Sequence, residues 1–443
     1  MTAPLLREIQ TYVSKTFPKY GRNKSQEIVR LLYEISQREK SDPYQIIPQS
    51  AKNVTTFHQL KKYLFSRRFP TSSNISISDY SLPSMKIKKS YQVNIDKDFN
   101  FEPEDIFIEK SVSHTNLALT TRKKYANKNI HEIDTYKEYI RKIDTSINSY
   151  NDRCKRLFII KENHNFFLPC PCANKAVSCG YHIFNLGIGC PFECVYCHLQ
   201  CYINAPGIVL PANIKDFFQD FNDYPKHIRL GTGQFTDSLA LDNLTHYSKS
   251  LVHFFRQYPD TLFELKTKSV HIKSLLDQKA CPNIIIAWSM NPPCIVDTME
   301  FYTATFTERL NAAIDCAQAG YKVAFHFDPI ICIPGWEQEY KTTVDKILSS
   351  VSPNDVAWIS LGGLRLSPLL KQVIENRFPG HPILNEELVL GFDRKLRYTT
   401  KQRIDIYQKM LRWIRKNNRT TPVYLCMEEP QIFKACQLES YRY

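Results

Sequence analysis

The sequence predicts an α/β protein in which a parallel sheet carries helices on its outer side, preceded by a mostly helical, basic N-terminal extension. Two observations lead to this fold class. Apolar, strand-like runs alternate with helix-length segments through the second half of the chain, as they do in parallel sheets with crossover helices. The first hundred residues contain 17 Lys and Arg against 8 Asp and Glu. With 443 residues, the chain has material for one large domain and a sizeable extension.

The N-terminal extension is expected to cover residues 1–102. Apolar side chains at helical spacing predict an amphipathic helix over residues 25–38. Residues 71–84 are rich in Ser, Asn and Pro, which predicts a loop or linker. The apolar side chains of the predicted helix are Ile28, Leu31, Leu32 and Ile35.

Two further regions follow the extension. Residues 103–180 are expected to lead into the sheet, and residues 181–443 to hold the sheet and the C-terminal elements. The first strand is predicted at residues 181–188. Later strands are predicted at 228–230, 262–265, 284–288, 323–327 and 358–361, with helices at 239–255, 305–319 and 338–348.

Three cysteines stand on the loop after the first predicted strand, in the spacing CxxxCxxC: Cys190, Cys194 and Cys197. A [4Fe–4S] cluster held entirely by protein takes four cysteines, so three thiolates leave one iron open for a small-molecule ligand. Zinc sites more often carry a second cysteine or histidine pair a dozen or more residues away. The spacing therefore favours an iron–sulfur cluster, with zinc as the alternative.

This triplet resembles that of the radical S-adenosylmethionine (SAM) enzymes, in which the open iron chelates SAM and the reduced cluster cleaves it to a 5′-deoxyadenosyl radical. Within that group, an ordered series of motifs over about residues 103 to 440 resembles the spore photoproduct lyase family. The basic extension is not part of the resemblance. The matching segments are residues 105–111, 133–138, 157–161, 230–239, 267–268, 288–291, 319–321 and 335–336.

The resemblance implies a partial (β/α)6 radical SAM barrel with its site at the carboxyl ends of the strands. It implies a [4Fe–4S] cluster on the three cysteines and SAM beside it. It also implies that Tyr196 packs against the adenine end of SAM and that Lys268 pairs with the SAM carboxylate. The other SAM-binding residues implied in this way are Gly231, Thr232, Gly233, Ser289 and Asn291.

The chain departs from the family pattern at two positions. Where spore photoproduct lyases carry a cysteine that donates a hydrogen atom to the substrate radical, this chain has Gln234. A glutamine N–H bond is too strong for that donation. The family's second tyrosine, after the last cluster cysteine, is replaced by His198. Nearby thiols that could substitute for the donor, or be ordinary buried cysteines, are Cys201, Cys294 and Cys332.

A second group of thiols precedes the first strand. Cys170, Cys172 and Cys179 lie close in sequence to His164 and His182. They could bind zinc or an auxiliary cluster, or they could be structural thiols, and no second CxxC pair completes a site.

Charge and composition set expectations for partners and location. The net charge is +14 at pH 7, and basic residues alternate with aromatic ones near residues 61–68 and 86–89. Such patches suit a phosphate backbone, so a nucleic acid, with DNA favoured, is an expected partner; a solvated basic face is the alternative. No apolar run reaches membrane-spanning length and the N-terminus has no signal-peptide core, so we expect a cytoplasmic protein with reduced thiols and no membrane partner.

The sequence thus predicts a radical SAM enzyme that resembles spore photoproduct lyase and abstracts hydrogen from a nucleic acid or nucleotide, in the manner of DNA photoproduct repair. It would need a reductant such as flavodoxin or ferredoxin. One alternative is the same chemistry on a peptide or small metabolite, which the loss of the donor cysteine favours. Another is a non-catalytic iron–sulfur protein that binds nucleic acid. The substrate, the fate of SAM and the oligomeric state stay open.

Overall fold

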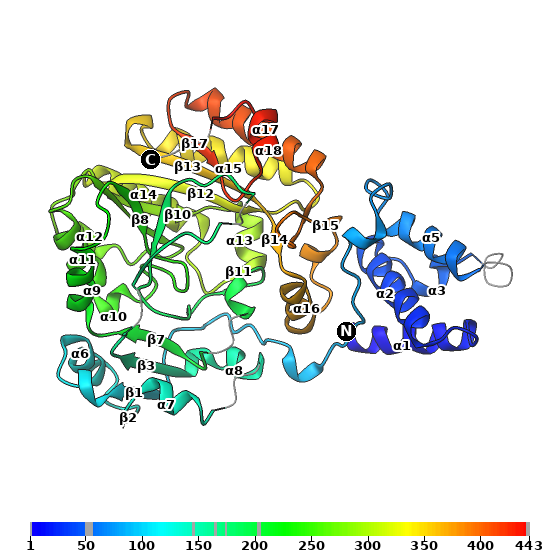
Figure 1. Cartoon of the computed structure of the whole chain (residues 1–443), viewed down its shortest axis with the longest axis horizontal. Coiled ribbons are helices and arrows are strands. Elements are labelled where there is room, and N and C mark those ends of the chain that lie inside the picture. The colour runs from blue at the N-terminus through cyan, green and yellow to red at the C-terminus, as the bar shows by residue number, and fades with distance from the viewer. Residues whose placement is uncertain are drawn as a thin grey trace. The chain divides into compact units, whose positions relative to one another are not determined.

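A computed structural model describes residues 2–48, 56–143, 147–163, 166–172, 175–201 and 205–439 (Figure 1). The chain divides into two compact units. One unit combines the first 94 residues with residues 331–336 and 363–403, and the other contains residues 95–330, 337–362 and 404–443. The boundaries expected from the sequence, at residues 102 and 180, remain a prediction.

The larger unit is built around a curled sheet of eight strands among the described residues, in the order β17-β13-β12-β10-β9-β8-β5-β4. Neighbouring strands from β5 to β12 pair in parallel, as do β13 and β17, and β4 is antiparallel at the edge. Strands β5, β8, β9, β10, β12 and β13 follow chain order across the sheet, which confirms the partial (β/α)6 barrel, and β4 and β17 extend the same order at its two edges. Their bounds are β4 (Phe167–Pro169), β5 (Tyr181–Phe184), β8 (Ile228–Gly231), β9 (Thr261–Thr267), β10 (Ile284–Ser289), β12 (Lys322–Ile330), β13 (Val356–Gly363) and β17 (Val423–Leu425).

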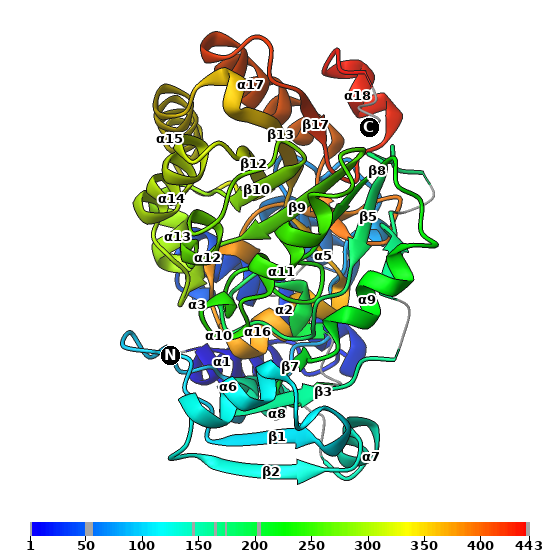
Figure 2. The same ribbon diagram turned by 90° about the vertical axis from the view of Figure 1, so that its left-hand side faces the viewer.

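Helices cover the outer face of this sheet (Figure 2). The ring of Phe255 on α11, for example, stacks on that of Phe263 on β9 at 4.0 Å between centroids. The helices are α9 (Ile214–Phe221), α10 (Asp242–Thr245), α11 (Tyr247–Phe255), α12 (Lys273–Leu276), α13 (Pro293–Met299), α14 (Phe306–Gln318), α15 (Trp336–Ser350), α17 (Thr400–Asn417) and α18 (Pro430–Ala435), with short 3-10 turns at Arg153–Lys155, His198–Cys201 and Pro353–Asp355.

Two predicted elements differ from the structure. The strand predicted over residues 181–188 ends at Phe184. The helix predicted over residues 239–255 is broken at His246, whose φ of 49° lies in the left-handed region. The break is held by Asp242, whose carboxylate accepts hydrogen bonds from the backbone N–H and the hydroxyl of Ser248. Hydrophobic periodicity cannot reveal such a local cap.

A second, parallel sheet has the order β2-β1-β3-β7, with β1 to β3 before the barrel in the chain and β7 between β5 and β8. Its core includes Phe107, Ile133, Phe158 and Val209. A two-stranded antiparallel ladder joins β6 to β11. These elements are β1 (Asp105–Glu109), α6 (Asn116–Lys124), β2 (Asn129–Ile133), α7 (Tyr136–Ile140), α8 (Ile147–Asn151), β3 (Arg156–Ile160), β6 (Glu193–Cys194), β7 (Ile208–Pro211) and β11 (Glu300–Phe301), with a 3-10 turn at Lys110–Val112.

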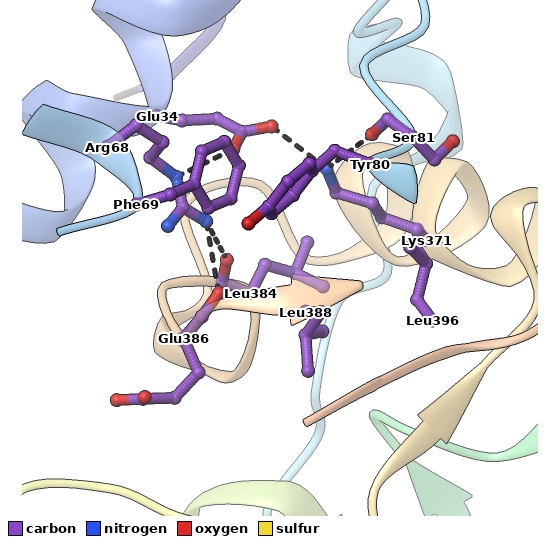
Figure 3. A pocket seen from close by; sticks show the side chains of 10 residues that line it. All are labelled: Glu34, Arg68, Phe69, Tyr80, Ser81, Lys371, Leu384, Glu386, Leu388 and Leu396. Carbon is purple, nitrogen blue, oxygen red and sulfur yellow. Dashed lines mark hydrogen bonds and ion pairs between the residues drawn. The ribbon is translucent and has the colours of Figure 1, made fainter. Parts of the chain in front are cut away.

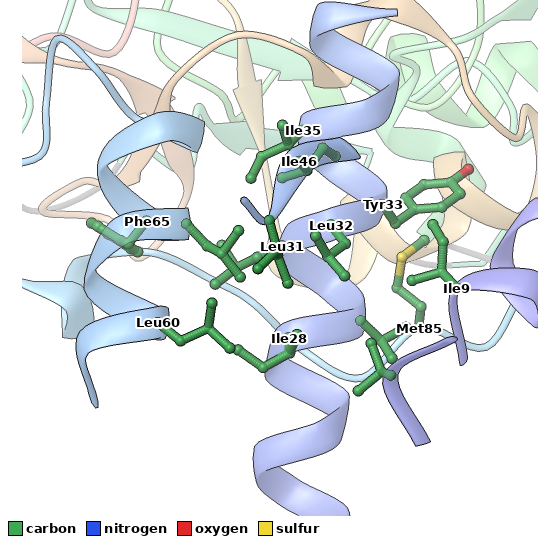
Figure 4. Close-up of a cluster of buried hydrophobic side chains, with 14 of the residues drawn as sticks. Ile9, Ile28, Leu31, Leu32, Tyr33, Ile35, Ile46, Leu60, Phe65 and Met85 are labelled. Carbon is green, nitrogen blue, oxygen red and sulfur yellow. The ribbon is translucent and has the colours of Figure 1, made fainter. Parts of the chain in front are cut away.

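The smaller unit begins with a helical cluster, which confirms the mostly helical extension. The predicted amphipathic helix is α2, and its four apolar side chains are fully buried against α1 and α5 (Figure 4). Thr56 and Gln59 form a capping box that fixes the start of α5. The elements are α1 (Thr2–Thr16), α2 (Arg22–Glu39), α3 (Pro43–Ile46) and α5 (Phe57–Arg68), followed by 3-10 turns at Ile77–Asp79 and Lys89–Tyr91.

A buried ion network joins these helices to the later part of the same unit (Figure 3). Glu34 on α2 pairs with Arg68 at 2.8 Å and with Lys371 of α16 at 2.9 Å. Arg30 binds both carboxylate oxygens of Glu375, at 3.0 and 2.6 Å. The later elements are β14 (Arg365–Leu366), α16 (Pro368–Arg377), a 3-10 turn at Pro382–Leu384, β15 (Leu388–Leu390) and β16 (Leu396–Tyr398). Among the described helices, none combines the length and the apolar character that a membrane crossing requires.

Candidate functional site

The cysteine loop follows β5 and is held from both sides. Cys194 lies in β6, which pairs with β11 opposite Glu300, and the Cys197 N–H donates to the Cys194 carbonyl at 3.0 Å. The Gln200 side-chain amide donates to the carbonyls of Cys194, Val195 and Cys197 at 2.8 to 3.3 Å. These hydrogen bonds fix the loop backbone.

Arg153 clamps the other end of the loop. Its Nε donates to the Cys190 carbonyl at 3.0 Å and its Nη2 to the Phe192 carbonyl at 2.7 Å. Its Nη1 lies 2.9 Å from a carboxylate oxygen of Glu193, and both side chains are buried. The guanidinium also lies over the Tyr150 ring, 4.3 Å from its centroid. A single buried side chain thus fixes the loop at residues 190, 192 and 193.

The three thiols suit an iron–sulfur cluster in which each thiolate would bind one iron. Burial raises the pKa of all three, so the thiolates need a compensating positive charge, which a metal centre supplies. In the part of the chain that the structure describes, no three His, Cys, Asp or Glu side chains stand together as the ligands of one metal ion. Three thiols on one fixed loop match the ligand number of a cluster that leaves one iron open.

Glu300 joins the predicted SAM-binding residues into one hydrogen-bond network. Its Oε1 accepts hydrogen bonds from the Tyr196 hydroxyl and, at 2.8 Å, from the Asn291 side chain. Lys268 Nζ lies 3.8 Å from the same oxygen and 5.9 Å from the centroid of the Tyr196 ring. The structure therefore brings together Tyr196, Lys268 and Asn291, which the sequence places on three separate loops. We call this the Glu300 network.

Arg309 and Tyr340 add further contacts to the Glu300 network. Arg309 Nη1 pairs with Glu300 Oε2 at 2.7 Å and donates to the Ser289 carbonyl at 2.9 Å. The Tyr340 hydroxyl donates to the Asn291 side-chain carbonyl at 2.7 Å. Ser289 therefore meets the network through its backbone.

Glu300 is fully buried and still ionised. Burial alone would raise the pKa of its carboxyl, but Lys268, Arg309 and the hydrogen bonds from Tyr196 and Asn291 lower it to about 2. Burial and the adjacent Glu300 charge raise the pKa of Tyr196, so its hydroxyl stays a donor. The network thus holds a permanent negative charge next to the lysine that is predicted to bind a carboxylate.

The predicted glycine-containing loop follows β8. Gly231 has no room for a side chain because a Cβ there would collide with the Tyr181 ring, and Gly233 has a φ of +95°. The Thr232 hydroxyl is hydrogen-bonded to that of Ser238, and its N–H donates to the Glu264 carbonyl at 3.1 Å. The two glycines are thus required by close packing and by backbone conformation.

Asp237 ties this loop to the end of β9. Its Oδ1 accepts from the Thr267 hydroxyl at 2.6 Å and from the backbone N–H groups of residues 239 and 240. Its Oδ2 accepts from the Lys268 N–H at 2.8 Å. Asp237 therefore positions Lys268 through the backbone.

Gln234 and His198 lie outside the Glu300 network. Gln234 is half-buried in the loop after β8, and the carbonyl of the next residue, Phe235, accepts from the Gly189 N–H at 2.8 Å. This contact brings the Gln234 loop beside the cysteine loop. His198 is exposed on the 3-10 turn after Cys197.

The candidate substitute thiols lie in different settings. Cys294 is on α13, 3.6 Å from a carboxylate oxygen of Glu339, and burial and that carboxylate raise its pKa to about 11. Cys332 is buried, and its N–H donates to the Tyr398 hydroxyl. Cys201 ends the 3-10 turn that begins at His198. None of the fourteen cysteines, all of which lie in the described residues, forms a disulfide.

A polar cluster inside the curled sheet was not anticipated from the sequence. Arg229 Nη2 pairs with Glu264 at 2.8 Å and donates to the Tyr424 hydroxyl at 2.8 Å, and its guanidinium lies 4.0 Å from the centroid of the Trp358 ring. His326 Nε2 lies 2.5 Å from the other Glu264 oxygen. Strands that are not neighbours in the sheet meet here, so the cluster fills the concave side.

Much of the basic charge in the extension is neutralised internally. Lys61 pairs with Glu27, Arg67 with Glu39 at 2.7 Å, and Arg68 is buried against Glu34. Lys62, Lys86, Lys88 and Lys89 are exposed, and Lys88 lies over the Tyr91 ring. Of the two basic patches, that around residues 86–89 therefore keeps more of its charge available.

Comparisons with known proteins agree with this geometry. The family model described as spore photoproduct lyase matches residues 101–415. The chain is 30% identical to a spore photoproduct lyase of Geobacillus sp. over 202 residues, which is 44% of this chain and 59% of that protein. It is 29% identical to the Bacillus subtilis protein of the same name over 43% of this chain and 58% of that one. The matched segments thus span less than two thirds of these relatives.

Solved structures show the same fold. A mutant spore photoproduct lyase with bound AdoMet and dinucleoside spore photoproduct superposes with a TM-score of 0.63 at 22% identity, over 74% of this chain and 99% of that one. A spore photoproduct lyase complexed with dinucleoside spore photoproduct gives 0.62 at 23% identity over the same shares.

Proposed function

Because the chain belongs to the spore photoproduct lyase family, we propose that it is a radical SAM enzyme that abstracts hydrogen from a nucleic-acid or nucleotide substrate, in the manner of DNA photoproduct repair. The observation that carries the proposal is the Glu300 network, which joins the cysteine loop to Tyr196, Lys268 and Asn291. A merely structural iron–sulfur loop would not need a buried charge network of this kind at its side.

Each residue has a role in this proposal. Cys190, Cys194 and Cys197 would hold the [4Fe–4S] cluster, and Arg153 keeps their loop in place. When bound, the reduced cluster and SAM supply the 5′-deoxyadenosyl radical.

The SAM-binding side of the site would then be formed as follows. Lys268 would bind the SAM carboxylate, and Glu300 holds that lysine toward the cysteine loop. Tyr196 and Asn291, fixed by Glu300, would line the same ligand, as would Ser289 and the loop of Gly231, Thr232 and Gly233.

The hydrogen-return step would differ from that of spore photoproduct lyases. Gln234 stands at the position of the family's donor cysteine, and His198 stands at that of the second tyrosine. The two changes affect the same relay, so we propose that a product radical is quenched by another donor. This difference favours one alternative substrate class, a peptide or small metabolite, with the same first step.

The proposed setting follows from the chemistry. A nucleic-acid substrate, DNA by preference, would meet exposed lysines of residues 86–89. A flavodoxin or ferredoxin would supply the electron. The cysteines, none of which forms a disulfide, and the proposed cluster are compatible with a reducing cytoplasm.

The test is SAM cleavage by anaerobically reconstituted protein under reduction, followed by addition of dinucleoside spore photoproduct. We expect 5′-deoxyadenosine from the wild-type protein and none from the variant with all three cluster cysteines changed to Ala. Gln234→Cys is expected to gain repair of the dinucleotide relative to wild type. A full cluster that does not cleave SAM would rule out the enzyme; cleavage without repair in either form would favour the alternative substrate.

A further inference from the structure

Four cysteines outside the cluster loop gather from three segments of the larger unit. Cys170 and Cys172 follow β4, Cys179 precedes β5, and Cys426 follows β17. All four are partly buried, and none forms a disulfide. The sequence suggests only the first three as a group, because Cys426 lies more than two hundred residues further on.

Two of the thiols already stand at the spacing of metal ligands. Cys172 Sγ lies 3.6 Å from Cys170 Sγ, with no bond between them. When two thiolates bind the same tetrahedral ion at about 2.3 Å, their sulfur atoms lie about 3.8 Å apart. The short Cys170-Pro171-Cys172 segment holds this spacing, and the Cys172 N–H donates to the Cys170 carbonyl at 2.7 Å.

Backbone hydrogen bonds bring the other two thiols to this pair. The Cys170 N–H donates to the Tyr181 carbonyl at 2.9 Å, which places the pair beside the start of β5 and therefore beside Cys179. The Val177 N–H donates to the Glu428 carbonyl at 2.8 Å, which joins the same loop to the segment after Cys426. These bonds span the two ends of the curled sheet, since β5 and β17 are the outermost parallel strands.

The thiols also interact electrostatically. The hydrogen bond from Cys172, burial, and the neighbouring thiols of Cys426 and Cys179 raise the pKa of Cys170. Within the described residues no three of these side chains lie at the ligand spacing of one ion. The Cys170–Cys172 pair thus has the spacing of two ligands of one ion, and Cys179 and Cys426 are the thiols that interact electrostatically with it.

We propose that Cys170, Cys172, Cys179 and Cys426 hold a second thiolate metal centre, either a structural zinc ion or an auxiliary iron–sulfur cluster, at the seam between β5 and β17. Four thiolates form a site that both kinds of centre accept. The centre would fasten the two edges of the open barrel. It is distinct from the radical SAM cluster and does not depend on the proposed reaction.

The test uses the full-length chain with Cys190, Cys194 and Cys197 all changed to Ala, so that metal bound elsewhere is counted alone. The protein is reconstituted anaerobically in two arms, one with iron and sulfide and the other with zinc. The metal and the sulfide bound per chain are then measured. We expect the protein from one of the two arms to retain one metal centre per chain after desalting. Zinc alone indicates the ion, and iron with equal sulfide indicates the auxiliary cluster.

Two variants in this background identify the ligands. Cys170→Ala with Cys172→Ala, and separately Cys426→Ala, are each expected to lose most of the bound metal. A matched control, Cys281→Ala with Cys316→Ala, is expected to retain it. Cobalt(II) added in place of zinc provides a second readout, because thiolate ligation gives charge-transfer absorption that the ligand variants would lack even where they still fold.

Three results would overturn the proposal. One is a cluster-free background that binds no metal in either arm. Another is metal binding that survives in both ligand variants. The last is a Cys170–Cys172 disulfide in protein purified under reducing, anaerobic conditions, which would assign the pair to redox chemistry instead.

Discussion

At the scale of single residues, Glu300 is the side chain on which the site depends most. It is buried, charged and shared by Tyr196, Asn291, Lys268 and Arg309. Glu300→Gln keeps the shape but removes the charge that holds the lysine and the arginine. We expect SAM affinity to fall by about 10-fold or more, equivalent to about 1.4 kcal/mol, while iron content stays at the wild-type level.

Equilibrium binding of SAM to the reconstituted protein measures this effect. Glu308→Gln is the matched control, because Glu308 lies exposed at the start of α14 and its carboxylate accepts hydrogen bonds from Thr305 rather than from Tyr196 or Asn291. Unchanged SAM affinity in Glu300→Gln, or an equal loss in Glu308→Gln, would show that the network does not position SAM-binding residues.

Glu300 also predicts a pH dependence of stability. Its pKa of about 2 in the folded chain lies below the usual 4.5, so its ionised form stabilises the fold fully above that usual value. The contribution is lost as pH falls through about 4.5 toward 2. We expect the difference in unfolding free energy between wild-type apoprotein and Glu300→Gln to shrink over this window, as measured by urea titration. A constant difference would mean that Glu300 is not ionised in the fold.

At the scale of elements, the cysteine loop depends on Arg153, which binds the carbonyls of Cys190 and Phe192 and the Glu193 carboxylate. Arg153→Lys keeps the charge but loses the fork of donors. We expect lower iron incorporation and faster cluster loss in air, measured by iron content and absorbance. Arg156→Lys, on the neighbouring strand β3, serves as the control. Equal cluster lifetimes in the two variants would contradict the clamp.

The order of the barrel strands could be predicted from the sequence because each strand is a short apolar run followed by a helix-length segment. The pattern of apolar residues predicted strands β8, β9, β10, β12 and β13 in this way. It did not reveal the break at His246, which a side-chain cap determines. It also did not reveal the sheet of β1, β2, β3 and β7, whose pairing joins strands far apart in the chain.

The candidate site was predictable only in part. Cys190, Cys194 and Cys197 carry a recognisable spacing, and Lys268 and Asn291 follow strand ends. Glu300 carries no such signal, since it reaches the site through the pairing of β11 with β6 across more than a hundred residues. Arg153 and Asp237 were missed for a similar reason, because they act on backbone groups and belong to no ligand motif.

At the scale of the whole molecule, the chain contains two compact units, and the smaller is stabilised by charge as well as by apolar burial. Glu34 compensates Arg30, Arg68 and Lys371, all buried. Glu34→Ala removes the carboxylate that these three buried cations share, while Arg30 keeps its pair with Glu375, and we expect a loss of about 3–5 kcal/mol in the unfolding free energy of this unit. Limited proteolysis or denaturant unfolding measures it. Glu27→Ala, at the half-exposed pair with Lys61, is expected to cost far less; equal losses would contradict the network.

The exposed lysines of the extension predict salt-dependent binding to DNA. Changing Lys86, Lys88 and Lys89 to Ala should reduce the slope of log affinity against log salt by roughly 0.9 for each lysine that meets a phosphate. Arg67→Ala is the control, since Arg67 is paired with Glu39. Fluorescence anisotropy with duplex DNA gives the slopes. An unchanged slope in the lysine variant would show that these lysines do not contact DNA phosphates.

The central claim is that this chain begins radical chemistry on a nucleotide, and isotope transfer tests it most directly. Reconstituted, reduced protein is given SAM and deuterated dinucleoside spore photoproduct, and the 5′-deoxyadenosine formed is analysed by mass spectrometry. We expect deuterium in that product, and none when the three cluster cysteines are changed to Ala. Continued SAM cleavage that yields only unlabelled 5′-deoxyadenosine would contradict it.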